Sequence, residues 1–235
     1  MELLFRDDAY VRTCTATVVA ADAGDIRLDR TVFYPTGGGQ PGDTGILRAG
    51  DLTVRIIDTV KGDDGPDSVI HVPEAGATLP APGTVVEAVI DWDRRHRHMR
   101  MHTALHLLCA VVPGSVTGGQ IAVDKSRLDF NVPAASLDKE AIATAINRLV
   151  ADDAPVTTTW ISDEDLAANP DLVRTMSVKP PSGSGRVRVL SIEGVDLQPC
   201  GGTHVARTGE VGRVEVIKIE NKGKQNRRVI IALTD

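Results

Sequence analysis

The sequence is poor in aromatic residues and cysteine, and it has no long apolar run. Its 235 residues include two Trp, two Tyr and three Phe, so aromatic stacking is not expected to dominate any nucleic-acid binding. Three cysteines, an odd number spread widely along the chain, do not form a disulfide framework. No apolar run approaches the roughly 18 residues of a transmembrane helix, and no signal peptide is recognisable. These absences predict a cytoplasmic protein without membrane contact.

The composition is that of an ordinary globular protein. Hydrophobic residues make up 42% of the chain and charged residues 25%, and the length is sufficient for two domains with a sizeable core. The formal net charge of -6 argues against indiscriminate affinity for nucleic acids, although a local basic patch remains compatible with it.

The sequence predicts an α+β fold in two domains. Short segments rich in Val, Ile and Thr, separated by turn residues, predict a small β-barrel over residues 1–93. Helices and strands follow in an α+β domain over residues 94–235. Helices are expected at 94–112, at 137–150 with Ser136 as N-cap, and after Ser162. Strands are expected at 11–19, 26–34, 52–60, 85–92, 126–130, 156–161, 187–192, 211–219 and 228–233.

Two pairs of residues have the spacing of metal ligands. His102 and His106 lie four apart on the expected helix, so both imidazoles share one face. Cys200 and His204 are also four apart, around two glycines that allow a tight loop. Three imidazoles and one thiolate form a donor set suited to tetrahedral zinc.

Three other interpretations of these residues remain open. Cys109 lies on the same helical face as the histidines and could replace Cys200, although a small buried core residue is its simpler role. A zinc endopeptidase also has two histidines four apart, but it needs a glutamate where this chain has Thr103. A closed structural zinc site uses four protein ligands as well.

A glycine-rich segment at residues 34–45 could approach a ligand closely with its backbone. It contains five glycines in twelve residues, and a mobile hairpin is the alternative interpretation. It is not a phosphate-binding P-loop, because no Gly-Lys-Ser/Thr sequence ends it.

These motifs together resemble a known family. The stretch from His102 to Leu108, with Cys200 to His204, resembles the two-part zinc signature of the editing domain shared by alanyl- and threonyl-tRNA synthetases. Residues 34–45, 126–130 and 219–224 resemble segments of the stand-alone AlaX proteins. The resemblance covers most of the chain and implies a medium-length AlaX protein with a barrel and an editing domain but no synthetase body.

The resemblance implies a zinc-dependent aminoacyl-tRNA deacylase. Its expected substrate is tRNA(Ala) mischarged with serine, or with glycine in some members. His102, His106, Cys200 and His204 match the zinc ligands. Thr36 and Gln120 are the expected catalytic-site residues: the Thr36 hydroxyl would contact serine, and Gln120 would position substrate or water unless it is an exposed loop amide.

RNA contact is expected from local basic clusters, since the chain is acidic overall. The expected tRNA-binding residues are Arg94, Arg95, Arg97, Arg100, Lys222 and Lys224. The alternative is that these charges only form a solvated surface. Asp196 has two interpretations, a partner that orients a zinc-bound histidine and a simple turn residue. No obligate protein partner is evident.

The alternative function is a non-catalytic module that binds zinc and RNA and is related to the editing domain.

Overall fold

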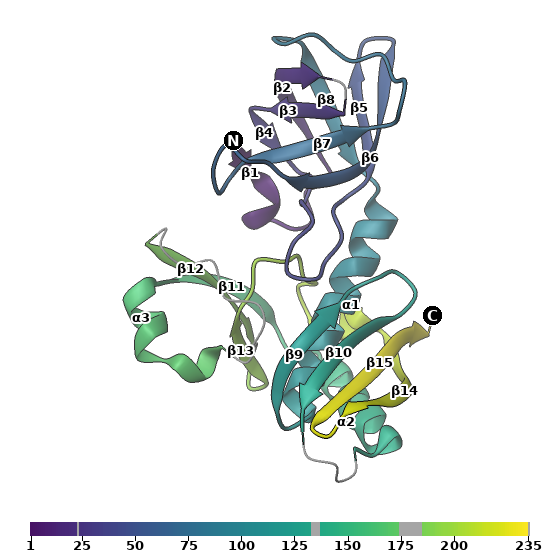
Figure 1. The fold of residues 1–235 in the computed structure, drawn as a ribbon, viewed down its shortest axis with the longest axis vertical. Coiled ribbons are helices and arrows are strands. Elements are labelled where there is room, and N and C mark those ends of the chain that lie inside the picture. The colour runs from purple at the N-terminus through teal and green to yellow at the C-terminus, as the bar shows by residue number, and fades with distance from the viewer. Residues whose placement is uncertain (23, 133–136, 174–184, 235) are drawn as a thin grey trace. The chain divides into compact units, whose positions relative to one another are not determined.

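Six strands close into a β-barrel (Figure 1), so the predicted barrel is present. The computed structural model describes residues 1–22, 24–132, 137–173 and 185–234. Neighbouring strands in the barrel follow the order β2 (Thr13–Asp22), β3 (Asp25–Leu28), β7 (Val69–Pro73), β6 (Leu52–Lys61), β5 (Gly45–Ala49) and β8 (Val85–Ile90). Buried and exposed residues alternate along β8, and the inward side chains form an apolar core. A short parallel pair, β1 (Glu2–Leu3) and β4 (Arg30–Thr31), lies beside the single turn η1 (Leu4–Arg6).

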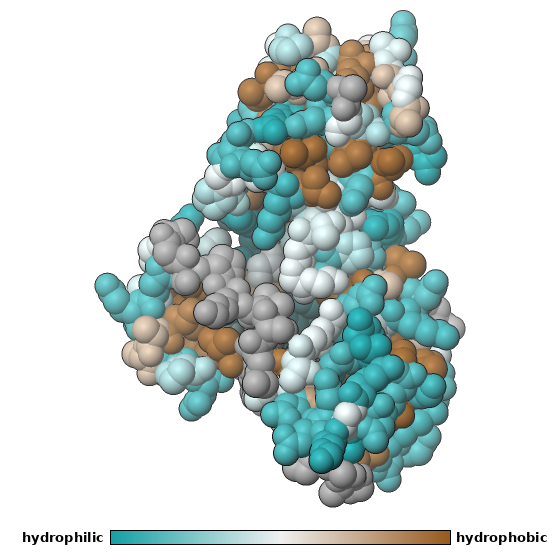
Figure 2. Space-filling model, viewed as in Figure 1, coloured by the Kyte–Doolittle hydropathy of each residue, from teal (hydrophilic) through white to brown (hydrophobic). Residues whose placement is uncertain are grey.

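The chain forms two compact units, Met1–Arg97 and His98–Asp235. The second contains a four-stranded antiparallel sheet in the order β14 (Arg213–Gly223), β15 (Asn226–Thr234), β10 (Ser126–Asn131) and β9 (Ser115–Gln120). Helix α2 (Lys139–Ala151) packs on β14 with a buried stripe of Ile142, Ile146 and Val150, the spacing expected of an amphipathic helix. The exposed face over β10 and β15 is predominantly hydrophilic (Figure 2).

A three-stranded antiparallel sheet completes the second unit. Its order is β11 (Val156–Ser162), β12 (Arg186–Ile192) and β13 (Asp196–Pro199). Ser162 caps the short helix α3 (Asp163–Ala168) through a capping box with Asp165, as predicted. The short 3-10 helix η2 (Pro170–Leu172) follows α3, and a second one, η3 (Thr208–Val211), precedes β14.

Helix α1 (Trp92–Val111) is buried on nearly all sides in its second half. Every residue from Met101 to Cys109 is buried, so the polar side chains in this stretch need partners within the protein. None of the described helices is long and apolar enough to cross a membrane.

Several predicted boundaries are wrong. Residues 26–34 do not form one strand, because the chain leaves β3 at Asp29, whose carboxylate accepts from the Thr17 backbone N–H at 2.7 Å, and then pairs with β1. Helix α1 begins at Trp92, two residues before its predicted start. Ser136 lies outside the described residues, and the N-cap of α2 is Asp138, whose carboxylate accepts from two backbone N–H groups.

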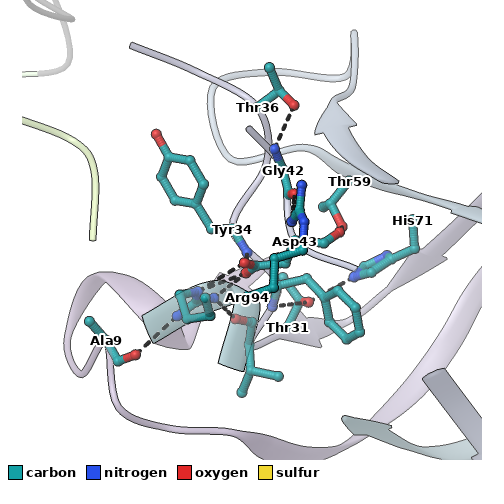
Figure 3. Close-up of polar contacts among 12 residues, drawn as sticks. Ala9, Thr31, Tyr34, Thr36, Gly42, Asp43, Thr59, His71 and Arg94 are labelled. Carbon is teal, nitrogen blue, oxygen red and sulfur yellow. Dashed lines mark hydrogen bonds and ion pairs between the residues drawn. The ribbon is translucent and has the colours of Figure 1, made fainter. Parts of the chain in front are cut away.

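A buried histidine, His71, joins segments of the barrel unit by hydrogen bonds (Figure 3). His71 Nδ1 lies 3.0 Å from the Ile26 carbonyl, and its Nε2 lies 2.7 Å from Thr31 Oγ1. A neutral ring satisfies both contacts if Nδ1 donates and Nε2 accepts from the Thr31 hydroxyl. That hydroxyl also accepts from the Phe33 backbone N–H at 3.0 Å. Burial lowers the pKa of His71 to about 4, which agrees with the neutral form.

Candidate metal centre

Helix α1 supplies two histidines to one buried site. His102 and His106 are 8% and 7% exposed, and their ring centroids lie 5.4 Å apart. The four-residue spacing places them one turn apart on the same face, as the sequence predicts. Buried imidazoles on an apolar helix require polar partners, and the partners come from the loop after β13.

Arg188 on β12 shapes that loop. Its Nη1 donates to the carbonyls of Cys200 at 3.0 Å and Gly202 at 2.9 Å. The Cys200 backbone N–H in turn donates to the Arg188 carbonyl at 3.0 Å. The loop carbonyls are thereby engaged by Arg188, while the side chains of Cys200 and His204 meet the α1 histidines.

The donor atoms of His102, His106, Cys200 and His204 all lie within 4.8 Å of one another. Cys200 Sγ is 3.6 Å from His102 Nε2 and 3.2 Å from His204 Nε2. A tetrahedral zinc ion with ordinary bond lengths separates a sulfur and a nitrogen ligand by about 3.6 Å. The donor types and spacing therefore fit zinc. The three histidines are buried, and Cys200 is partly exposed as a residue although its thiol is enclosed.

Two further side chains orient the histidines. Asp196 Oδ2 lies 2.9 Å from His106 Nδ1, which favours the orienting role over that of a simple turn residue. Gln198 Nε2 donates to both oxygens of that carboxylate at 2.9 and 2.8 Å. Thr103 Oγ1 lies 3.2 Å from His204 Nδ1. Both contacts leave Nε2 as the metal-binding nitrogen. The role of Thr103 is not recognisable from the sequence, because the contact joins residues 101 positions apart.

The electrostatics of the four side chains favour a thiolate beside a charged imidazole. Burial raises the pKa of the Cys200 thiol, but the charges of His102 and His204, with hydrogen bonds, bring it well below 9.0. Burial lowers the pKa of His106, yet its hydrogen bonds to Asp196 and Cys200 raise it to about 9. Burial and the charge of His102 lower the pKa of His204 to about 3. Metal binding therefore has to displace a proton from His106, and affinity should depend on pH.

Cys109 is not part of this cluster. Its side chain is buried, with 7% exposed, and the group of metal-binding donors found among the described residues contains Cys200 instead. The position that carries a catalytic glutamate in zinc endopeptidases is Thr103, which contacts His204. The geometry favours neither the Cys109 interpretation nor the peptidase interpretation.

The glycine-rich segment forms a loop held by hydrogen bonds within itself and to β6 (Figure 3). Thr36 Oγ1 accepts from the Gly42 N–H at 2.8 Å, and the Thr36 N–H donates to the Thr59 carbonyl at 2.8 Å. A Cβ on Gly42 would lie 2.0 Å from that same carbonyl, so the close approach requires glycine. Thr36 is exposed, and its hydroxyl proton remains able to donate to a ligand.

Arg95 anchors this loop from helix α1. Its guanidinium donates to the Asp43 carboxylate, with Nε 2.9 and 3.0 Å from the two oxygens, and to the carbonyl of Val32 at 2.6 Å. The side chains of Arg95 and Asp43 are 0% and 1% exposed. Such an arginine has no surface to offer a phosphate, so we remove Arg95 from the residues expected to bind tRNA.

The other predicted RNA-contacting residues are at or near the surface. Arg94 donates to the Gly42 carbonyl at 2.6 Å, and Arg100 donates to the Val211 carbonyl at 3.0 Å, so part of each guanidinium is engaged. Arg97 is partly exposed. Lys222 is ion-paired with Glu220 at 2.8 Å, and Lys224 is exposed at the turn between β14 and β15.

Gln120 is at the end of a strand, not in the loop that its alternative interpretation assumes. It is the exposed last residue of β9, and its Oε1 accepts from Arg127 Nε at 3.3 Å. The sequence does not predict this strand, because Gln120 follows two glycines and glycine is rare in strands. Pairing with β10 holds the segment extended.

Two family profiles match parts of this chain. The family profile described as the threonyl and alanyl tRNA synthetase second additional domain matches residues 187–230, and that of class II (A) tRNA synthetases matches residues 7–94. The alanyl-tRNA editing protein AlaX-M of Methanosarcina barkeri is 38% identical, over 100% of this chain and 99% of its own length. The protein of the same name from Methanosarcina acetivorans is 36% identical over the same shares.

The chain belongs to the AlaX family. A longer AlaX-L protein of Pyrococcus horikoshii is 30% identical over 97% of this chain and 57% of its own length. The AlaX-M relatives thus match this chain from end to end, and AlaX-L extends beyond it.

Proposed function

We propose that this AlaX protein hydrolyses the aminoacyl ester of mischarged tRNA(Ala), chiefly Ser-tRNA(Ala) and also Gly-tRNA(Ala), with zinc at the four-donor cluster. The observation that carries the proposal is the convergence of His102, His106, Cys200 and His204 in a chain that matches proteins named alanyl-tRNA editing proteins over their full length.

The physical need for such an enzyme follows from the limits of pocket selectivity. A pocket for alanine rejects a substrate lacking one methylene by only about 1–3 kcal/mol, and it poorly rejects one that adds a hydroxyl. Glycine and serine are therefore both misattached. A second site that hydrogen-bonds the serine hydroxyl can reject alanine, because alanine leaves a polar group of that site unpaired.

Zinc bound at the cluster would supply Lewis-acid polarisation of the ester carbonyl or a water of lowered pKa. The chain's own residues prepare the site for that role. Asp196, held by Gln198, keeps the His106 ring in place, and Thr103 does the same for His204. We assign the approach of the ester to the side of Cys200, because Cys200 is the partly exposed residue of the four.

Thr36 is our candidate for reading the serine hydroxyl, and Gln120 for positioning substrate or water. Thr36 already accepts one hydrogen bond from Gly42, which fixes its hydroxyl and leaves the proton for a ligand. Contacts with the tRNA backbone are assigned to Arg94, Arg97, Arg100, Lys222 and Lys224, whose charges would make binding salt-dependent.

The deciding experiment is deacylation of Ser-tRNA(Ala) by zinc-loaded protein, with Gly-, Ala- and Thr-charged tRNAs beside it. We expect His102→Ala and Cys200→Ala to lose both zinc and hydrolysis, while Cys109→Ala keeps both. Zinc binding and tRNA binding without any hydrolysis would instead establish the non-catalytic module, in which the four ligands form a closed structural site.

Selectivity is tested with a matched pair of substitutions. Thr36→Val removes the hydroxyl and should lower kcat/KM on Ser-tRNA(Ala) by roughly ten- to a hundred-fold, with a far smaller effect on Gly-tRNA(Ala). Thr36→Ser keeps the acceptor for Gly42 and should retain most activity. Equal losses on the serine and glycine substrates would indicate damage to the loop rather than a lost serine contact.

A further inference from the structure

One of the two tryptophans, Trp160, is exposed on β11, the edge strand of the three-stranded sheet whose other edge strand, β13, precedes Cys200. Trp160 on β11 is 39% exposed, and the guanidinium carbon of Arg186 lies 4.4 Å from its ring centroid. A large aromatic ring at the surface is costly to leave in water, and the residues that precede it on β11, Thr157 to Thr159, are exposed as well. Trp160 and Arg186 therefore form a flat, positively charged surface that is not part of the hydrophobic core.

The register of the sheet connects this surface to the cluster. Trp160 pairs with Arg188 on β12, and Val189 pairs with Pro199 on β13. Cys200 therefore continues the same cross-strand row, which its backbone hydrogen bond to Arg188 confirms. Two strand spacings separate Trp160 from Cys200 along that row, or about 10 Å.

Trp160 also lies on the face of the sheet that meets the cluster. Directly paired residues point to the same face, and alternate residues along a strand share it. Arg188 is on the face of Leu190 and Ile192, whose partners on β13 are Gln198 and Asp196. Asp196 contacts His106. Trp160 is thus at the outer edge of that face, in the same cross-strand row as Cys200.

We propose that Trp160, with Arg186 over its ring, is the stacking platform for the base of the terminal nucleoside of the charged tRNA. This inference rests on the proposed function, which places the aminoacyl ester at the cluster. The ester is carried by the ribose of that nucleoside, so the base lies one sugar away from the ester.

The chemistry of the pair suits this ligand. Every nucleobase presents a flat π-face that stacks on indole, and the guanidinium of Arg186 supplies a positive charge for the adjoining phosphate. Because stacking needs no base-specific hydrogen bond, the platform would fix the position of the ester without reading sequence. Trp160 is therefore a substrate-positioning residue beside the site.

Fluorescence tests this contact without requiring catalysis. In a Trp92→Phe protein, Trp160 is the remaining tryptophan. We expect its emission to be quenched by uncharged tRNA(Ala), and much less by the same tRNA with the terminal adenosine removed. Equal quenching by both RNAs, or none by either, would overturn the proposal. Emission that changes with protein concentration in the absence of RNA would assign Trp160 to a contact between copies of the chain and overturn it too.

Variants test the energetic weight of the contact. Trp160→Ala should weaken binding of the intact tRNA by about 5- to 150-fold, the range measured for single base–aromatic stacks, while Trp160→Phe should lose much less. Affinity for the shortened tRNA should not change. Leu197→Ala is the matched control, because Leu197 is a 46% exposed apolar residue on the opposite face of the same sheet.

Activity separates the two proposals. If the wild-type protein hydrolyses Ser-tRNA(Ala) and Trp160→Ala does so with unchanged kcat/KM, the stacking platform is refuted while the editing function stands. If the wild-type protein does not hydrolyse the ester but the terminal adenosine still quenches Trp160, the editing function fails and the nucleoside contact stands.

Discussion

Removing the charge of Arg95 should destabilise the barrel unit severely, without a direct effect on RNA affinity. In Arg95→Met, the Asp43 carboxylate stays buried, with 1% of its side chain exposed. It keeps the backbone N–H of Tyr34 at 2.6 Å as a donor but loses its counter-charge. Breaking a buried pair in this way costs about 3–5 kcal/mol, because an unpaired charge remains in a medium that solvates it poorly.

The exposed pair Arg48–Glu87 provides the matched control in the same barrel. Its atoms are 3.4 Å apart, and its side chains are 52% and 51% exposed. Arg48→Met should therefore cost less than about 1 kcal/mol. Adding Asp43→Asn to Arg95→Met removes the unpaired charge and should recover part of the lost stability.

Urea unfolding followed by Trp92 fluorescence measures this effect in the right unit. A Trp160→Phe background leaves Trp92, in the barrel unit, as the remaining tryptophan. With a slope of about 1–3 kcal/mol per molar urea, Arg95→Met should lower the midpoint by roughly 1 M or more. Equal small shifts in Arg95→Met and Arg48→Met would refute the reasoning, as would lower tRNA affinity in an Arg95→Met protein that is fully folded.

Three further outcomes are expected. Asp196→Asn should weaken zinc binding by about 10- to 100-fold in chelator competition, because the charged partner of His106 is lost; unchanged affinity would contradict its positioning role. Burial lowers the pKa of His71 from 6.5 to about 4. The unfolded chain therefore binds a proton at His71 before the folded protein does, so the free energy of unfolding is highest above pH 6.5. It falls by about 3 kcal/mol in total as the pH drops toward 4. Urea midpoints should therefore fall more steeply over this range in wild type than in His71→Gln, and parallel curves would argue against a neutral buried ring. Lys224→Ala should weaken tRNA binding and reduce its salt slope by about one unit, whereas an identical slope would show that the side chain is only solvated.

The sequence predicts the features that depend on local spacing. The two ligand pairs are each four residues apart, and the helix that carries His102 and His106 is present. The strands expected at 11–19, 52–60 and 85–92 are also found within a few residues, whereas the barrel strands β5 and β7 are not predicted from the sequence. Local periodicity is sufficient for these features because the burial pattern of a regular element repeats along its own sequence.

Features that depend on distant partners are not predictable in this way. Arg95 looks like one member of a basic cluster, and only Asp43, 52 residues earlier, shows that it is a buried anchor. Strand β9 contains two glycines and is held extended by β10. The register that aligns Trp160 with Cys200 likewise depends on β12, which follows β11 after a long intervening segment.

The ligand pairs lie far apart along the chain, and this has a consequence for the order of assembly. His102 and Cys200 are separated by 98 positions, so bringing them together requires closure of a long loop, which folding reaches late. Small zinc domains are organised by the metal, which binds before they are folded. In the unfolded chain, His102 with His106 and Cys200 with His204 form two separate pairs of donors, and neither pair supplies the four ligands of the site. Metal capture should therefore be one of the last events in maturation.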